Sequence, residues 1–540
     1  MMNLFYKTFF IFCLLGTTIQ AQFSNDQLKK IDVLNYDFNI DINDQDNNIQ
    51  AVSYISIMPL QDVDSFYLQL IGKKDDGKGM TVTGVEINNQ VINNYKQIND
   101  KIVFKNPQKW KKGIIIHLEI VYSGRPIDGL YINKNKYGKR TFFGDNWPNR
   151  AHYWLPVIDH PSDKASLSFH IAAPSHYQII ASGEKVAHKH LKNHIDKWDF
   201  VSKTALPTKV MVFAAADFKV KNFPPVKLSE KTIEVSSWIY KDSPDQGFDD
   251  YKCAINVLKF YDSLIGPYSY DKLANVQSKT RFGGMENAGN IFYNENSVDG
   301  FKRVENLVAH EIGHQWFGNA VSEKNWRDIW LSEGFATYLT DLYLEHKYGR
   351  ERFNERMKME RNKVIRFQKS SDKPIVHDEN HNLMRLLNPN SYEKGAWVLH
   401  MLRHKIGDKL FFNSLQSYYK KYRNKNASTA DFIREVEMVS KQNLDAFFKQ
   451  WLYQSGLPKL KIDWQIRHDK LLIDVQQMSN LFDFELPILI KFKADKMIKV
   501  LNVKQQNNHF EILLPKSFSR ENISVSLDPN VNLLFEQIVE

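Results

Sequence analysis

The sequence predicts a multidomain α+β protein with an N-terminal antiparallel β domain, a mixed domain rich in helices, and a small β-sandwich-like domain at the C-terminus. Its 540 residues are enough for three or four domains of roughly 150 residues each. Apolar and polar residues alternate over residues 31–223, as is typical of half-buried strands, and the alternation returns after Pro458. Between these regions, apolar residues recur at helical spacing.

Residues 1–21 have the pattern of a secretory signal peptide. Lys7 precedes an apolar run at residues 9–15, and a small or polar stretch ends at Ala21, the expected cleavage site. The run is shorter than the roughly 20 residues that a membrane span requires. We therefore expect an exported protein, periplasmic or extracellular, with no membrane span in the mature chain. An uncleaved anchor is the alternative.

The N-terminal β domain is expected over residues 22–223. Segments such as residues 36–42 alternate between apolar and polar side chains, and Asn, Asp and Gly residues separate them. Each strand would then bury one face, as in a large antiparallel sheet. Pro224 and Pro225 interrupt this pattern and mark the expected boundary.

The second and third domains are expected over residues 224–458 and 459–540. In the second, a short β portion leads into helices, one of which covers residues 333–347 and has Gly349 placed to end it. The third contains three short alternating runs, at residues 460–464, 471–475 and 486–492. Such runs predict a small β domain.

Charge and cysteine content limit the function classes. Lys and Arg outnumber Asp and Glu by 72 to 62, and the net charge of +10 is spread along the chain. This is typical of a solvated surface with a weak attraction to acidic peptides or anionic surfaces, and nothing in it indicates nucleic-acid recognition. Signal cleavage would leave Cys253 as the only cysteine, so we expect no intramolecular disulfide. The sequence does not reveal the oligomeric state.

The pattern H-E-x-x-H at residues 310–314 predicts a metal site. On a helix, His310 and His314 share a face, so both imidazoles can bind one ion. Glu333 follows after eighteen residues and completes three protein ligands with an open fourth position, as in catalytic zinc sites. Glu311 lies about 100° further round the helix and can reach a water at that position. A helix with two histidines by chance is the alternative, but burying them unpaired would cost several kcal/mol.

Two further segments carry weaker signals. Residues 281–289, R-F-G-G-M-E-N-A-G, combine a glycine pair with a carboxylate before an apolar run, and such glycines let an extended ligand approach a strand edge. Tyr392 lies at the start of an expected helix that runs through Leu402. Taken alone, a glycine pair is usually a turn, and a tyrosine at a helix start is usually packing.

Together these segments resemble the aminopeptidase N-like family of zinc metallopeptidases, the gluzincins. The chain matches its G-x-M-E-N signature at residues 283–287 and H-E-x-x-H-x18-E at residues 310–333. Pro156, Asp159 and Pro161 match its P-x-x-D-x-P segment. The resemblance covers most of the chain between about residues 30 and 460. It implies a thermolysin-like second domain and an aminopeptidase that removes N-terminal residues from peptides.

The resemblance also implies roles for individual residues. His310, His314 and Glu333 would bind one Zn²⁺ per chain, and zinc lowers the pKa of a bound water to roughly 7. Glu311 would act as the general base. Tyr392 would donate a hydrogen bond to the oxyanion of the tetrahedral intermediate.

The G-x-M-E-N segment would bind the substrate. Glu286 would hold the cationic amino group at a fixed distance from the scissile bond, which selects free N-termini. Gly283 and Gly284 would present backbone groups to the main chain of the peptide. Met285 is expected either beside the pocket for the first side chain or in the core, and Asn287 completes the segment.

The sequence departs from the family in three places. Family members usually carry a second amine anchor, a Gln or Glu upstream of P-x-x-D-x-P, for which Asp145 is the candidate here. They commonly place a carboxylate seven residues after the glutamate ligand, where this chain has Thr340 with Asp341 beside it. Such outer-shell partners tune metal affinity about 10–100-fold. Members generally continue into a large helical domain, which this sequence lacks before Glu540, so we expect a short form with a more open cleft.

Two alternatives to a secreted aminopeptidase stay open. A zinc endopeptidase of the thermolysin type would use the same metal site, but it would accept an N-acetylated peptide that Glu286 should refuse. A catalytically inactive peptide-binding relative would keep the scaffold, although it would not need Glu311 or Tyr392. Leukotriene-type epoxide hydrolysis, a side branch of the family, does not fit an exported protein.

Overall fold

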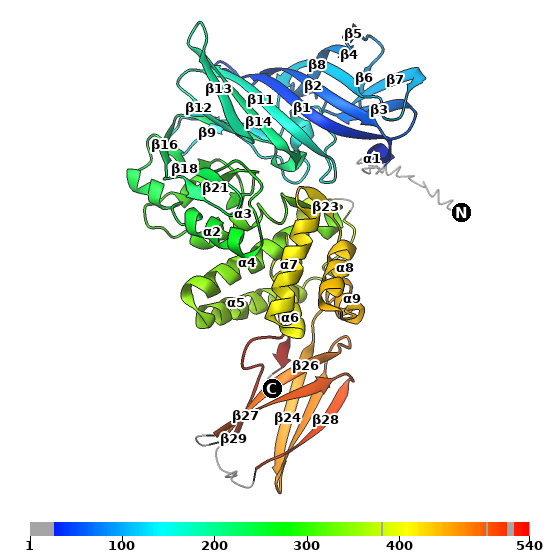
Figure 1. The fold of residues 1–540 in the computed structure, drawn as a ribbon, viewed down its shortest axis with the longest axis vertical. Coiled ribbons are helices and arrows are strands. Elements are labelled where there is room, and N and C mark those ends of the chain that lie inside the picture. The colour runs from blue at the N-terminus through cyan, green and yellow to red at the C-terminus, as the bar shows by residue number, and fades with distance from the viewer. Residues whose placement is uncertain (1–25, 380–381, 493–494, 516–522, 539–540) are drawn as a thin grey trace, which may run out of the picture.

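The computed structural model confirms the α+β fold class. It describes residues 26–379, 382–492, 495–515 and 523–538, so the expected signal peptide lies outside the described residues. Figure 1 shows the β domain at the N-terminal end, the helices in the middle and the small β domain at the C-terminal end. None of the helices in the described ranges is both long and apolar enough to cross a membrane.

An eight-stranded sheet forms the body of the N-terminal domain, in the order β13-β14-β11-β1-β2-β8-β4-β5. Burial alternates along strands such as β11, as the sequence pattern predicts. Neighbouring strands are antiparallel except β1 and β11, which pair in parallel. The sequence did not predict this parallel pair, because the alternation of apolar and polar residues does not specify strand direction. The short helix α1 (Asp26–Lys30) leads into the strands, which are β1 (Ile31–Asp41), β2 (Ile49–Pro59), β4 (Gly79–Ile87), β5 (Gln90–Val91), β8 (Ile116–Arg125), β11 (Lys164–Pro174), β13 (Glu184–His190) and β14 (Ile195–Pro207).

Two smaller sheets complete this domain. Their strands are β3 (Val63–Gln69), β7 (Lys101–Trp110) and β6 (Lys96–Ile98) in one, and β12 (Gln178–Ala181), β15 (Phe213–Ala216), β10 (Arg140–Gly144) and β9 (Leu130–Lys134) in the other. Trp154 joins the large sheet to the second of these. Its buried ring lies parallel to Phe169 of β11 and edge-on to Phe213 of β15. Its indole N–H donates to Asn146 Oδ1 at 2.8 Å, so the polar end of the side chain is also satisfied.

The sheet of the second domain places the G-x-M-E-N segment at an edge. Its order is β16-β18-β19-β21-β20, and β20 pairs antiparallel with β21 as the last strand. The strands are β16 (Phe218–Asn222), β17 (Val226–Lys227), β18 (Thr232–Tyr240), β19 (Lys272–Ser278), β20 (Gly284–Met285) and β21 (Asn290–Asn294). Since β16 pairs with β18, the predicted boundary at Pro224 falls inside this sheet.

Helices make up the rest of the second domain, together with the short parallel pair β22 (Val321–Glu323) and β23 (Lys425–Ala427). The helices are α2 (Ala254–Leu264), α3 (Glu305–Gly313), α4 (Trp330–Tyr348), α5 (Arg350–Gln368), α6 (Gly395–Ile406), α7 (Asp408–Tyr422), α8 (Thr429–Ser440) and α9 (Asp445–Tyr453). As predicted, α4 ends at Gly349, which has a φ of 88°.

Two glycines bring α4 against α6 beside the predicted site. A Cβ on Gly334 would lie 2.9 Å from Gly395 Cα and 3.1 Å from the Ser391 carbonyl oxygen. Any larger residue at position 334 would therefore separate the helices. This close approach holds Glu333 near the turn that carries Tyr392.

A half-buried lysine and a buried one connect the N-terminal domain to the segment between α3 and α4. Lys164 Nζ donates to the carbonyl oxygens of Asn319 and Ala320, at 2.9 Å each. Burial lowers the pKa of Lys164 to about 7. Lys209 Nζ lies 2.6 Å from Glu323 Oε1, and both side chains are at most 1% exposed. The N-terminal domain thus fixes the chain that follows the H-E-x-x-H residues.

The third domain is the small β domain that the sequence predicts. Its strands are β28 (Asn507–Leu513), β25 (Lys470–Gln477), β24 (Lys459–Arg467) and β30 (Glu536–Ile538) in one sheet, and β27 (Asp495–Val503), β26 (Phe484–Phe492) and β29 (Ile523–Leu527) in the other. Arg361 of α5 donates to the Leu533 carbonyl oxygen at 2.6 Å. His400 of α6 lies 2.9 Å from the Val531 carbonyl oxygen. These bonds attach the domain to the helices.

Candidate active site

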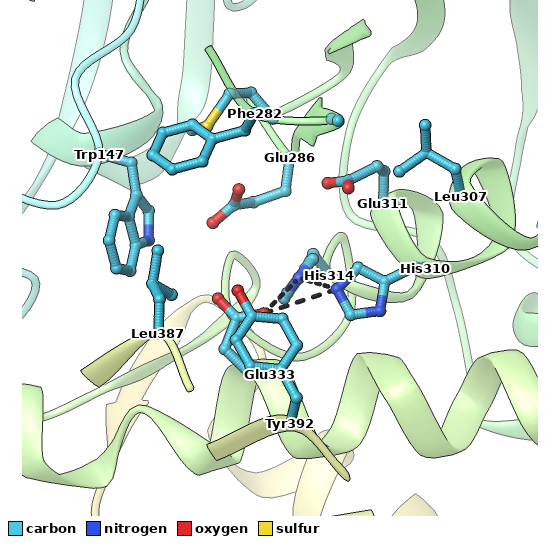
Figure 2. Close-up of a pocket in the computed structure, with 13 residues that line it drawn as sticks. Trp147, Phe282, Glu286, Leu307, His310, Glu311, His314, Glu333, Leu387 and Tyr392 are labelled. Carbon is cyan, nitrogen blue, oxygen red and sulfur yellow. Dashed lines mark hydrogen bonds and ion pairs between the residues drawn. The ribbon is translucent and has the colours of Figure 1, made fainter. Parts of the chain in front are cut away.

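Helices α3 and α4 bring the three predicted metal ligands together. His310 is in the last turn of α3, His314 is its C-terminal cap, and Glu333 is in the first turn of α4. The His314 N–H donates to the His310 carbonyl oxygen at 3.2 Å, so helical geometry continues through His314. Both imidazole rings therefore lie on the same face of the helix. The two Nε2 atoms are 3.1 Å apart, and Glu333 Oε2 lies 3.2 Å from that of His314 and 3.5 Å from that of His310. Figure 2 shows this arrangement.

These donor atoms fit a tetrahedral zinc ion. Bonds of about 2.0–2.1 Å place the ligand atoms of tetrahedral zinc roughly 3.3 Å apart, which matches the spacing found. Glu333 Oε2 is buried and lies beside the two imidazole nitrogens, but it has no hydrogen bond of good geometry within the described part of the chain. Burial alone would lower the pKa of His314, but Glu333 raises it to about 9. The cluster therefore stabilises positive charge, which a divalent cation would supply.

Ser332 and a backbone carbonyl, rather than Thr340 or Asp341, lie beside His314 Nδ1. His314 Nδ1 lies 3.0 Å from Ser332 Oγ and 3.3 Å from the Phe317 carbonyl oxygen. The Thr340 hydroxyl instead donates to the carbonyl of its own helix, and Asp341 forms a buried ion pair with an arginine of α5. An Nδ1–H bonded to Phe317 leaves Nε2 free to bind metal.

Glu311 points into the cavity beside the ligand atoms (Figure 2). Gly284 makes room for it, since a Cβ at that position would lie 2.4 Å from Glu311 Oε1. Burial raises the pKa of Glu311 well above its ordinary value; His314 opposes this, and Glu286 adds to it. A raised pKa brings a carboxylate closer to the operating pH, where a general base is most effective.

Tyr392 lies in a π-helical turn, Asn390–Lys394, rather than in the simple helix start that the sequence predicts. Single π-helical turns are frequent at functional sites. The ring is nearly parallel to that of His310, with centroids 5.9 Å apart. Burial, and then the nearby carboxylates, raise the pKa of Tyr392 well above its ordinary value. The phenol therefore stays protonated and can donate a hydrogen bond.

Glu286 follows the edge strand β20, and its backbone is held in place. Its carbonyl oxygen accepts bonds from Gln315 Nε2 at 2.8 Å and Asn319 Nδ2 at 2.6 Å. The side chain is 5% exposed, and among the described residues its Oε1 has no hydrogen-bond partner. Figure 2 shows the carboxylate directed into the cavity. Because an unpaired buried carboxylate is costly, this is a site for a cation.

A cavity of about 240 Å³ joins these groups. The residues that line it are Trp147, Phe282, Gly283, Gly284, Met285, Glu286, Leu307, His310, Glu311, His314, Glu333, Leu387 and Tyr392. Met285 thus borders the cavity, whereas Asn287 is fully buried outside its lining. Sequence reasoning missed Trp147, Phe282, Leu307 and Leu387. The first two adjoin recognised motifs, which was an available signal; no pattern marks Leu387.

Asp145 does not line this cavity. Its side chain forms a buried ion pair with Arg150 and accepts a hydrogen bond from Thr280 Oγ1 at 3.2 Å. Burial raises the pKa of Asp145 to about 6, although Arg150 opposes the shift. Arg150 and Thr280 therefore bind one carboxylate oxygen each, away from the residues that line the cavity. The geometry does not support Asp145 as a second amine anchor.

Two family models match most of the chain. Residues 33–210 match the peptidase M1 N-terminal domain, and residues 250–451 match the peptidase family M1 domain. Glutamyl aminopeptidase of Sus scrofa is 28% identical over 425 residues, which are 74% of this chain and 44% of that protein. Probable aminopeptidase 2 of Sulfurisphaera tokodaii is 26% identical, over 73% of this chain and 50% of that protein. The chain spans half or less of the length of these two relatives.

Solved structures show the same fold. The M1 zinc metallopeptidase from Deinococcus radiodurans matches with a TM-score of 0.69 at 22% identity, over 80% of this chain and 96% of that one. Aminopeptidase A of Legionella pneumophila, in complex with aspartic acid, matches with a TM-score of 0.81 at 16% identity, over 96% and 61%. The fold and the donor set are those of a zinc metallopeptidase. The chain belongs to peptidase family M1.

Proposed function

We propose that this protein is an exported zinc aminopeptidase that removes N-terminal residues from peptides. One observation carries the activity: Glu286, whose buried Oε1 has no hydrogen-bond partner among the described residues, lies in the same cavity as the three metal ligands. The free amino terminus of a peptide is a cation that would pair with it, whereas an internal peptide bond offers none. This favours an aminopeptidase over an endopeptidase of the thermolysin type. The signal-peptide pattern of residues 1–21 supports export.

Each side chain of the site has its own role in hydrolysis of the peptide bond. Zinc, when bound by His310, His314 and Glu333, is a Lewis acid that lowers the pKa of a coordinated water to roughly 7. Glu311 accepts a proton from the attacking water and passes it to the leaving amine. The Tyr392 hydroxyl donates a hydrogen bond to the carbonyl oxygen as it gains negative charge.

Glu286 sets the position of the substrate. By pairing with the ammonium group, it aligns the first peptide bond with Glu311 and Tyr392. Gly283 and the edge-strand residue Gly284 line the cavity, where they would lie beside the extended main chain of the peptide. Only a residue with a free amine can then occupy the position next to the scissile bond.

The cavity wall favours a large apolar first residue. Trp147, Phe282 and Leu387 stand on the same side of the cavity as Glu286 (Figure 2). Among the described residues, no Lys or Arg side chain lines the cavity. Glutamyl aminopeptidase is named for an acidic residue, and the Legionella protein was solved with aspartic acid. Here an acidic side chain would lose its hydration without gaining a cationic partner.

Aminoacyl-anilide substrates test this proposal. Burying a Leu or Phe side chain stabilises the complex by about 1.5–3 kcal/mol. We therefore expect kcat/KM for leucyl- and phenylalanyl-anilides to exceed that for the glutamyl-anilide by about 10–100-fold. A zinc chelator should abolish all three activities, and added zinc should restore them. If the glutamyl substrate were cleaved fastest, the proposed preference for a large apolar first residue would be wrong. If activity persisted in the presence of the chelator, the proposed role of the metal site would be wrong.

A further inference from the structure

A second group of metal-binding side chains lies on the N-terminal domain. His188 and His190 are on β13, and Asp196 is on β14. In the register of this pair, His190 is opposite Asp196 and His188 is opposite Trp198. Residues two apart share a face of a strand, so these four side chains lie on one face of the pair. Lys189 and Lys197 pair with each other on the other face.

The donor atoms converge on the carboxylate. Asp196 Oδ2 lies 2.8 Å from His188 Nε2, and Oδ1 lies 2.9 Å from His190 Nδ1. One ligand atom from each residue can be chosen so that all lie within 4.8 Å of one another. The Asp196 side chain is 5% exposed, whereas that of His190 is 80% exposed and that of His188 is 28% exposed. An ion can therefore approach from solvent onto a buried anionic oxygen.

Neighbouring side chains hold two of the three ligands in place. The His188 ring is stacked on the Trp198 ring, with centroids 3.7 Å apart and planes 15° apart. Ser175 Oγ donates to Asp196 Oδ1 at 2.6 Å, which orients the carboxylate. Side chains that are already ordered lose little rotamer entropy on binding, and outer-shell bonds of this kind strengthen metal sites.

The chemistry of the donors limits the ion. Two imidazole nitrogens and one carboxylate oxygen suit Zn²⁺, Cu²⁺ or Ni²⁺, whereas Ca²⁺ and Mg²⁺ prefer oxygen ligands. We propose that His188, His190 and Asp196 form a second, structural metal site that binds a divalent transition ion such as Zn²⁺. The bound ion connects β13, the edge strand of the eight-stranded sheet, to β14. An edge strand is hydrogen-bonded to the sheet on one side only. The one described cysteine, Cys253, is free, so within the described residues no disulfide holds this strand in place.

The zinc stoichiometry of the full chain tests this site. Equilibrium dialysis against Zn²⁺, followed by elemental analysis, should give two ions per chain for the wild type. The double variant His188→Ala/His190→Ala should bind one ion and keep full aminopeptidase activity. His170→Ala is the matched control, because His170 in the same sheet also bonds carboxylates, those of Asp199 and Asp37, but lies in no group of three ligands. It should bind two.

A thermal measurement separates a metal site from hydrogen-bonded histidines. Zinc added beyond the first equivalent should raise the melting temperature of the wild type and of His170→Ala, but not that of the double variant. The exposed single variant His190→Ala should bind the second ion at least about tenfold more weakly. One zinc per chain in an active wild type, or a second zinc retained by the double variant, would overturn the proposal. Activity that persists after a chelator has removed all zinc would instead contradict the proposed function.

Discussion

Replacing Glu311 by Gln is expected to lower kcat by about 10²–10⁴-fold, the usual contribution of a general base. Gln has nearly the same shape but cannot accept the proton of the attacking water. Glu311 is outside the group of three metal-binding side chains, so zinc content should not change. The comparison needs kcat on a leucyl-anilide and elemental analysis of the same purified sample.

Glu305→Gln is the matched control for this variant. Glu305 lies in the first turn of the same helix, α3, and bonds Lys347 and Tyr348 outside the cavity. We expect this control to keep kcat. If Glu311→Gln lost its zinc, or kept a kcat within about threefold of the wild type, the general-base role would be wrong.

Replacing Lys209 by Met is expected to destabilise the protein by about 3–5 kcal/mol, the range measured when one partner of a buried ion pair is removed. The variant leaves Glu323 buried without its cation. Burial already raises the pKa of Glu323 against the opposing effect of Lys209. The measurement is the free energy of unfolding in urea at neutral pH.

Two further variants decide whether the buried charge is the cause. Lys209→Met/Glu323→Met should recover most of the stability, since buried ion pairs are often replaceable by apolar residues of similar size. Lys111→Met breaks an exposed pair with Asp62, with side chains 65% and 46% exposed, and should lower the free energy of unfolding far less than Lys209→Met. If Lys209→Met cost no more than Lys111→Met, Lys209 would not hold the two domains together.

The metal ligands could be predicted from the sequence because their arrangement is local. His310 and His314 are one turn apart, and any helix through them brings their rings together. The prediction of Glu333 as the third ligand also required the ligand spacing of a known family. The structure adds the reason that α4 reaches the Tyr392 turn, which is the glycine contact between Gly334 and Gly395.

The substrate pocket could not be predicted because its wall is assembled over long distances. Trp147, Phe282 and Leu387 come from three separate segments, and no periodicity connects them. The expectation for Asp145 rested on its charge and on its place upstream of the P-x-x-D-x-P segment. Which partner a carboxylate selects depends on packing, and here Arg150 binds it. The parallel pairing of β1 with β11 was missed for a related reason, since alternation is the same in both strand directions.

The requirement for a free amino terminus tests the account most directly. The measurement is the initial rate of hydrolysis, by mass spectrometry, of one peptide with a leucine at its N-terminus and of its N-acetylated form. Losing the charge partner of Glu286 should cost at least about 2 kcal/mol, so the acetylated peptide should be cleaved at least about 30-fold more slowly. The variant Glu286→Gln should narrow that gap while keeping its zinc. Equal rates for the two peptides, or cleavage of the blocked peptide at an internal bond, would contradict the account.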